Sequence, residues 1–113
     1  MTILIVDDNK KIRSFIGLVL NDPVYNILEA SNGKNAVDMF LKHNPEVVLM
    51  DIKMDEIDGL TATKVIRELS ENVKIIIVTD FNEDSLREQA RKAGANDYLL
   101  KENLLALKEM LKN

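Results

Sequence analysis

Cysteine is absent from the 113 residues of this chain, which excludes disulfides, thiolate nucleophiles and every metal site built on sulfur. A reducing compartment suits such a sequence, although a chain without cysteine can work in any location. Aromatic residues make up only 4% of the chain, too few for a surface on which nucleic-acid bases stack. The net charge of -4 also argues against direct binding to nucleic acid.

Long hydrophobic runs are missing as well. The longest apolar segments, Ile3–Val6 and Ile75–Val78, have the length of a strand and fall far short of a membrane span. No basic segment or cleavage motif accompanies the first of them, so we expect no signal peptide, no membrane contact and a cytoplasmic location. With 46% hydrophobic and 30% charged residues and no linker or repeat, residues 1–113 are predicted to form one globular domain.

Two kinds of segment alternate along the chain. Short runs of strand length lie at Ile3–Val6, Val24–Leu28, Val47–Met50, Ile75–Val78 and Asp97–Leu100. Between them, apolar residues recur three and four positions apart, which is the spacing of an amphipathic helix. Turn and cap signals separate the segments at Asn21–Pro23, Ser31–Gly33, His43–Pro45, Asp58–Gly59 and Gly94. This alternation predicts an α/β fold, a (βα)5 doubly wound five-stranded parallel sheet with helices on both faces.

Polar side chains follow four of the predicted strands. Asp7 and Asp8 come after the first strand, Asp51 after the third, Thr79 at the end of the fourth and Lys101 after the fifth. In an open parallel sheet, binding sites lie at the carboxyl ends of the strands, beside the point where strand order reverses. If the order is 2-1-3-4-5, the three carboxylates converge on one crevice, with the hydroxyl and the lysine on its other side.

This set of side chains suits phosphoryl transfer. Clustered carboxylates raise one another's pKa unless a cation neutralises them, and oxygen ligands in a partly open site suit Mg²⁺. Such an ion would allow the Asp51 carboxylate to attack phosphorus, while Lys101 and Thr79 would donate to phosphoryl oxygens. Taken singly, each residue is more often structural; Asp8, for example, could cap a helix that begins near Lys10. The combination after four separate strands is what favours a joint site.

The segments that carry these residues resemble the receiver domains of two-component response regulators over essentially the whole chain. The matching segments are Ile3–Asn9, Val48–Leu60, Ile76–Thr79 and Gly94–Lys101. The resemblance implies the flavodoxin-like strand order 2-1-3-4-5. It also implies a signalling domain, not an enzyme, that accepts a phosphoryl group from a sensor histidine kinase or a histidine phosphotransfer protein and then changes its interaction surface.

The resemblance implies a phosphoacceptor and a metal site. Asp51 would be the phosphoacceptor, and Asp7 and Asp8 would be the acidic pair that serves Mg²⁺. We expect Asp8 to be the direct ligand of that pair. Asp51 and the backbone carbonyl of Lys53 would complete the ligands that the protein supplies.

Switch residues are implied in the same way. Thr79 would be the switch hydroxyl, Tyr98 the switch aromatic and Lys101 the lysine that contacts the phosphoryl group. The run Leu100–Leu104 is similar to receivers that precede a helix-turn-helix DNA-binding domain, so a stand-alone and an excised receiver both stay open. The apolar stripe of the last predicted helix leaves a phosphorylation-dependent homodimer open.

Three positions depart from the family's common pattern. Asp55 stands where many receivers carry proline, which implies a looser loop. Asp80 follows Thr79 where a small residue is usual; its charge could oppose phosphorylation, or it could begin a capping box with Glu83. Lys53 places a cation near the site entrance, either as a solvated surface lysine or as a group that tunes phosphoryl lifetime.

Three other functions compete with this interpretation. A Mg²⁺-dependent phosphatase commonly needs a second carboxylate two residues past its nucleophile, where Lys53 stands. A flavodoxin-like cofactor binder needs a hydroxyl- and glycine-rich phosphate loop, where the sequence has the acidic run Asp7–Lys10. A receiver-like docking domain that never takes phosphate is favoured only by Asp80.

Overall fold

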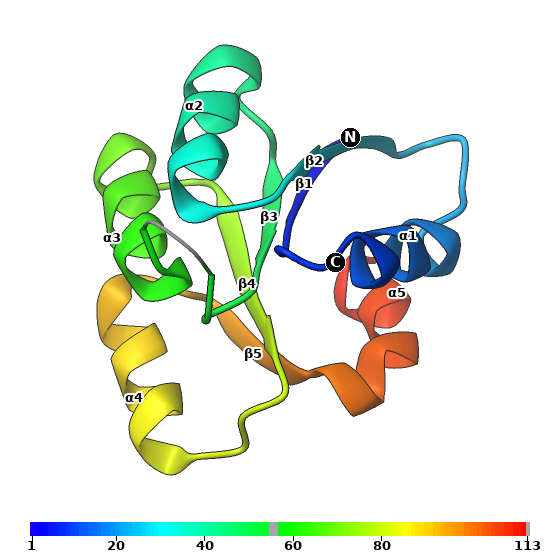
Figure 1. Ribbon diagram of the computed structural model, residues 1–113. Coiled ribbons are helices and arrows are strands. Elements are labelled where there is room, and N and C mark those ends of the chain that lie inside the picture. Colours follow the sequence, from blue (N-terminus) through cyan, green and yellow to red (C-terminus); the bar gives the residue numbers. More distant parts are fainter. Residues whose placement is uncertain (55–56, 113) are drawn as a thin grey trace.

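A computed structural model describes residues 1–54 and 57–112, in which strands and helices alternate (Figure 1). The elements are β1 (Thr2–Val6), α1 (Lys10–Val19), β2 (Asn26–Ala30), α2 (Gly33–His43), β3 (Val47–Met50), α3 (Gly59–Leu69), β4 (Lys74–Thr79), α4 (Asp84–Ala93), β5 (Asp97–Leu100), the 3-10 helix η1 (Lys101–Ala106) and α5 (Leu107–Met110). All neighbouring strands pair in parallel, in the order β2-β1-β3-β4-β5. The predicted (βα)5 fold and its strand order are confirmed.

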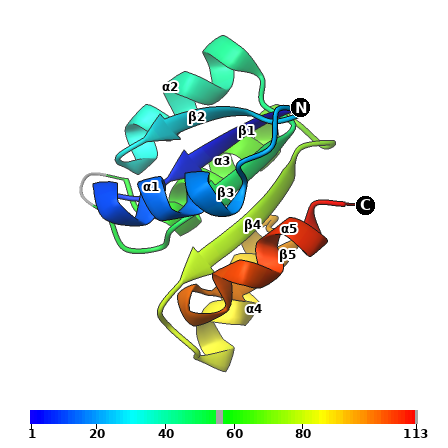
Figure 2. The ribbon, with the colours of Figure 1, turned by 90° about the vertical axis from the view of Figure 1, so that its right-hand side faces the viewer.

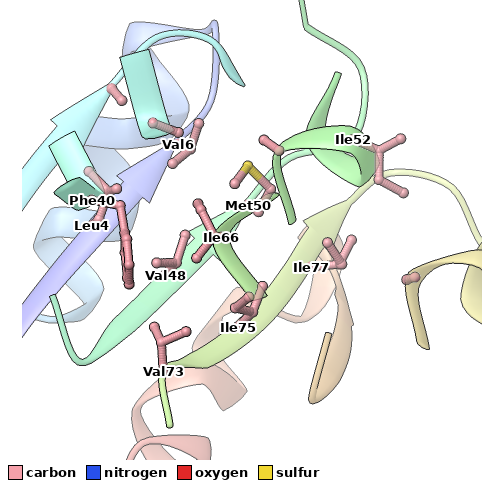
Figure 3. Close-up of a cluster of buried hydrophobic side chains, with 14 residues drawn as sticks. Leu4, Val6, Phe40, Val48, Met50, Ile52, Ile66, Val73, Ile75 and Ile77 are labelled. Carbon is pink, nitrogen blue, oxygen red and sulfur yellow. The ribbon is translucent and has the colours of Figure 1, made fainter. Parts of the chain in front are cut away.

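The sheet lies between two layers of helices. Helices α2, α3 and α4 cover one face, and α1 packs with η1 and α5 on the other (Figures 1 and 2). Because successive strand residues point to opposite faces, each strand contributes to two hydrophobic clusters. The cluster beneath α2, α3 and α4 includes Leu4, Val6, Phe40, Val48, Met50, Ile66, Ile75 and Ile77 (Figure 3). The cluster on the other face includes Ile3, Ile5, Ile16, Leu20, Leu49, Ile76, Leu104, Leu107 and Leu111. Every residue of β3 is buried, so the packing of both faces holds the end of this strand, after which Asp51 follows, in place.

Local capping groups begin and end the helices where the sequence indicates. The side chains of Asn32 and Asp58 accept hydrogen bonds from backbone N–H groups in the first turns of α2 and α3. Gly94 ends α4 in the left-handed region, with φ 111°, as expected for a glycine in that position. Asn9 caps α1, so the alternative that Asp8 caps this helix is wrong. None of the described helices is long and apolar enough to cross a lipid bilayer.

The second strand begins later than predicted. We expected Val24–Leu28, whereas β2 spans Asn26–Ala30. The Asp22 side chain accepts a hydrogen bond from the Val24 N–H, and the Asp22 carbonyl accepts one from the Tyr25 N–H. These bonds form a turn that leaves Val24 exposed and outside the sheet.

The segment after β5 is not the regular helix that its apolar stripe predicts. It begins as the 3-10 helix η1 and turns α-helical only at Leu107. Asn103 has non-helical backbone angles, which kink the segment. Leu104 and Leu107 are buried in the core, whereas Leu105 is 78% exposed. The kink brings the chain directly from Lys101 at the strand end onto the face of the sheet.

Candidate functional site

The strand order reverses between β1 and β3, and the acidic residues meet there. Val6 pairs with Met50, and the N–H of Asp51 donates to the Val6 carbonyl at 2.9 Å. Oxygen atoms from the carboxylates of Asp7, Asp8 and Asp51 all lie within 4.8 Å of one another. The structure therefore brings together the three carboxylates that the sequence predicts at one crevice.

Helix α3 packs directly against the backbone of Asp51. The N–H of Gly59 donates to the Ile52 carbonyl at 2.8 Å, and a Cβ at this position would collide with the carbonyl oxygen of Asp51. Only glycine permits this approach. The close contact holds Asp51 between its own strand and the start of the next helix.

Asp7 is held by partners on all of its polar groups. Its N–H donates to the Ala30 carbonyl at 3.1 Å, and its own carbonyl accepts from Arg13 Nη1 at 2.7 Å. In the carboxylate, Oδ1 accepts from the Asn9 N–H at 2.9 Å and Oδ2 lies 2.9 Å from Lys101 Nζ. Asp7 is thus a fixed, buried anion.

Asp51 is held on one side only. Its Oδ1 accepts from the Ile52 N–H at 2.9 Å and lies 3.5 Å from Lys101 Nζ. Among residues 1–54 and 57–112, no hydrogen bond or ion pair reaches its Oδ2. Burial and then the charge of Asp7 raise the pKa of Asp51 to about 6, against the lowering effects of Lys101 and the Ile52 N–H. The residue therefore combines a restrained carboxylate with one oxygen open to a reaction partner.

One lysine serves these carboxylates. Burial lowers the pKa of Lys101, but its hydrogen bond to Asp7 and the charges of Asp51 and Asp7 outweigh that effect and raise the pKa. Lys101 is therefore charged at neutral pH, yet a single ammonium leaves the ionised cluster negative.

Asp8 is exposed, and its carboxylate has no partner in the described part of the chain. The donor set of oxygens and its excess negative charge fit a hard divalent cation such as Mg²⁺.

On the far side of the crevice, Thr79 and Tyr98 are linked through one residue. Thr79 is fully buried, and its Oγ1 accepts a hydrogen bond from the Phe81 N–H at 3.2 Å. The carbonyl of Phe81 in turn accepts from the Tyr98 hydroxyl at 2.6 Å. The guanidinium of Arg87 lies 4.5 Å from the centre of the Tyr98 ring. Tyr98 is half-buried in this arrangement, so the two predicted switch residues are already connected.

The positions that depart from the family's pattern have different surroundings. Lys53 Nζ lies 4.7 Å from the centre of the Phe81 ring, so Lys53 joins the loop after β3 to the loop after β4. Asp80 is exposed and contributes to the raised pKa of Lys101. The capping box between Asp80 and Glu83 is wrong, because Glu83 itself is the N-cap of α4 and makes no side-chain cap. The interpretation of Asp55 lies outside the described residues.

Comparison with known proteins identifies the family. Residues 3–112 match the family model of the response regulator receiver domain. The chain belongs to this family. It is 38% identical over 100 residues to the chemotaxis protein CheY of Bacillus subtilis (strain 168), covering 88% of this chain and 83% of that protein. It is 34% identical over 99 residues to sporulation initiation phosphotransferase F of the same organism, covering 88% of this chain and 80% of the relative.

A solved receiver-like structure shows the same fold. The crystal structure of a putative response regulator from Chloroflexus aurantiacus J-10-fl superposes with a TM-score of 0.91 at 32% identity, covering 99% of this chain and 94% of the other. Receiver domains are signalling domains of two-component systems, phosphorylated by histidine kinases or phosphotransfer proteins, and bind Mg²⁺ at an acidic pocket. In this receiver, Asp7, Asp8 and Asp51 form an acidic cluster that could hold such an ion.

Two residues that contact the site were not predicted from the sequence. Phe81 contacts the switch residues through its backbone groups, and no sequence signal marks a backbone contact of this kind. Arg13 reaches the Asp7 carbonyl from the first turns of α1. Its position offered a weak signal, because it is an arginine beside the apolar residues of an amphipathic helix close to the acidic pair.

Proposed function

We propose that this receiver accepts a phosphoryl group on Asp51 from a sensor histidine kinase or histidine phosphotransfer protein, in a Mg²⁺-dependent reaction, and then changes its interaction surface. The observation that carries the proposal is the asymmetry of the Asp51 carboxylate. Its Oδ1 is restrained by Ile52 and Lys101, and no described residue occupies its Oδ2. An oxygen in that state is available as a nucleophile toward phosphorus.

The residues that would hold Mg²⁺ are Asp8, Asp51 and the backbone carbonyl of Lys53, with Asp7 in support. Asp8 is the better direct ligand because both carboxylate oxygens of Asp7 already have partners at 2.9 Å. When bound, the ion would offset the negative charge of the carboxylates and of the transferring group. Its charge would also offset the effects of burial and of the Asp7 charge, which together raise the pKa of Asp51.

Phosphoryl transfer then follows from the positions of the side chains. Asp51 Oδ2 attacks phosphorus, a new O–P bond forms, and the P–N bond to the donor histidine breaks with its electron pair leaving on the imidazole. Lys101 Nζ supplies positive charge at the Oδ1 side of the acceptor. Thr79 accepts from Phe81, so its own hydroxyl hydrogen remains available to a phosphoryl oxygen. The chain's role is signalling, and any catalysis is limited to its own phosphorylation and dephosphorylation.

The switch is supported by the hydrogen-bonded link through Phe81. If Thr79 shifts toward the phosphoryl group, its bond with the Phe81 N–H lengthens. The Phe81 carbonyl, which accepts a hydrogen bond from the Tyr98 hydroxyl, would then move relative to that hydroxyl. The phosphoryl group would thereby favour one arrangement of this link over another, which is a population shift. The surface expected to change is formed by α4, β5 and the helical segment that follows β5, η1 with α5.

Intact-mass spectrometry tests the acceptor assignment. The native protein, incubated with Mg²⁺ and acetyl phosphate, should gain the mass of one phosphoryl group, and chelation should prevent the gain. Asp51→Asn should abolish it, and Asp8→Ala should nearly do so because metal binding is lost. Asp38→Asn, the same change at an exposed position of α2, serves as the matched control and should label normally. Undiminished labelling of the Asp51→Asn protein would refute the assignment.

A further inference from the structure

Arg13 makes two contacts that the proposed chemistry does not use. Its side chain is only 14% exposed although it belongs to the surface helix α1. Nη1 donates to the carbonyl oxygen of Asp7 at 2.7 Å, and Nε donates to Glu29 Oε1 at 2.8 Å. The guanidinium thus connects the edge strand β2 to the backbone of the acidic pair.

The contact with Asp7 determines the orientation of the following residue. The Asp7 carbonyl belongs to the peptide unit that joins Asp7 to Asp8, and that unit is planar. Fixing the direction of the carbonyl therefore also fixes the N–H and the Cα of Asp8. The carboxylate of Asp8 has no partner of its own in residues 1–54 and 57–112. The point from which this side chain leaves the backbone therefore depends on the contact that Arg13 makes.

Glu29 restricts the position of the Arg13 guanidinium. A free arginine beside three carboxylates would pair with one of them, since guanidinium and carboxylate form strong bidentate contacts. The ion pair with Glu29, whose side chain is 49% exposed, adds little stability by itself. Its effect is to hold Nε on the β2 side, so that Arg13 reaches the Asp7 carbonyl and leaves the Asp8 carboxylate free.

We propose that Arg13, held by Glu29, is a positioning residue that directs the carboxylate of Asp8 into the metal site beside Asp51. This inference rests on the proposed function, because it assumes that Asp8 is a Mg²⁺ ligand. Loss of groups that orient metal ligands commonly changes metal affinity by about 10- to 100-fold.

Mg²⁺ binding, measured without any phosphodonor, tests the inference. Calorimetric titration gives the dissociation constant, and ¹⁵N NMR reports the amide shifts of Asp8 and Asn9. Arg13→Ala should raise the dissociation constant about tenfold and alter the Asp8 amide shift in the absence of metal. Arg13→Lys, which has one nitrogen for two acceptors, should fall between Arg13→Ala and the native protein. The matched control is Arg91→Ala, which removes an exposed Arg–Glu pair on α4 and should bind Mg²⁺ normally.

The outcomes separate this inference from the proposed function. If the native protein and Asp8→Ala bind Mg²⁺ equally, the metal site itself is wrong. If Asp8→Ala loses binding while Arg13→Ala binds as the native protein does, the positioning role alone is overturned. Should Arg13→Ala fail to fold, Glu29→Ala and Arg13→Lys provide the test, and native affinity in both would overturn the role.

Discussion

The ammonium group of Lys101 lies between two carboxylates that are almost fully buried. Its Nζ lies 2.9 Å from Asp7 and 3.5 Å from Asp51. Burying a charge is costly unless it is paired, and here the pairing is incomplete. The raised pKa of Asp51, about 6, expresses that imbalance. The crevice therefore carries unfavourable electrostatic energy that a divalent cation would relieve.

Mg²⁺ should consequently stabilise the unphosphorylated protein. Millimolar Mg²⁺ should raise the Tm of the native protein, because an ion that binds only the folded state shifts the equilibrium toward it. Asp8→Ala should show no such rise, and Asp51→Asn should raise the Tm in metal-free buffer by removing a buried charge. Differential scanning calorimetry, with NaCl matched for ionic strength, measures these shifts. Equal Mg²⁺-induced rises in the native and Asp8→Ala proteins would mean that the ion binds elsewhere.

Asp80 adds negative charge beside the same lysine. Replacing it with alanine should increase the rate of phosphorylation by acetyl phosphate, because an incoming dianion meets less repulsion. The increase should be modest and smaller at high salt, since Asp80 is exposed. Asp97→Ala, at the opposite end of the neighbouring strand β5, is the matched control. Identical rates for the native and Asp80→Ala proteins at low salt would contradict this role.

At the scale of single residues, the sequence predicted the site where side chains act directly. Asp7, Asp51 and Lys101 follow predicted strands, so their meeting could be inferred once the family resemblance supplied the strand order. Phe81 and Arg13 act through backbone carbonyl and N–H groups. Such contacts depend on the path of a loop and on the reach of a long side chain, which residue types do not reveal.

Among the elements, α4 is weakly anchored at the end nearest the site. Ala90 is its one fully buried residue, and its N-cap, Glu83, makes no side-chain hydrogen bond. Its other end is held firmly: Arg67 of α3 donates to the Gly94 carbonyl at 3.0 Å and to Asn96 Oδ1 at 2.9 Å. Few buried contacts and an open first turn are features of a segment that rearranges at low free-energy cost.

Helix α3 contains a buried group whose replacement should be stabilising. Thr63 is fully buried, and its Oγ1 has no hydrogen-bond partner among the described residues. Thr63→Val keeps the shape and removes the unsatisfied hydroxyl, so the free energy of unfolding should rise by about 1 kcal/mol. Urea denaturation followed by circular dichroism measures the change. Thr61→Val, an exposed position on the same helix, should have little effect, and destabilisation by Thr63→Val would show that the hydroxyl is needed.

Element boundaries were predictable where one residue determines them. Asn32, Asp58 and Gly94 mark helix ends through their own side chain or backbone freedom. The start of β2 was missed because a turn stabilised by Asp22 overrides the apolar pattern that includes Val24. The break in the last helix was missed for a similar reason, since leucines three and four apart fit a helix whether or not its first turn is 3-10.

In the whole molecule, the carboxyl edge of the sheet connects the surroundings of Asp51 to a distant surface. Lys101 after β5 reaches Asp7 after β1, although β3 and β4 lie between these strands. Tyr98 of β5 reaches Phe81 beyond β4, and Phe81 contacts Thr79. Because these contacts span the strand ends, we expect a charge added at Asp51 to act on α4 and β5 together. Through this connection, phosphorylation of Asp51 would change a surface formed by several elements.

Amide NMR with a phosphoryl mimic tests that claim most directly. Beryllofluoride, added with Mg²⁺ to uniformly ¹⁵N-labelled protein, should shift the amides of Asp7, Asp8 and Asp51. It should also shift those of residues 82–93 and Tyr98, and Asp51→Asn should show neither set of changes. Shifts confined to Asp7, Asp8 and Asp51, with residues 82–93 and Tyr98 unchanged, would contradict the account.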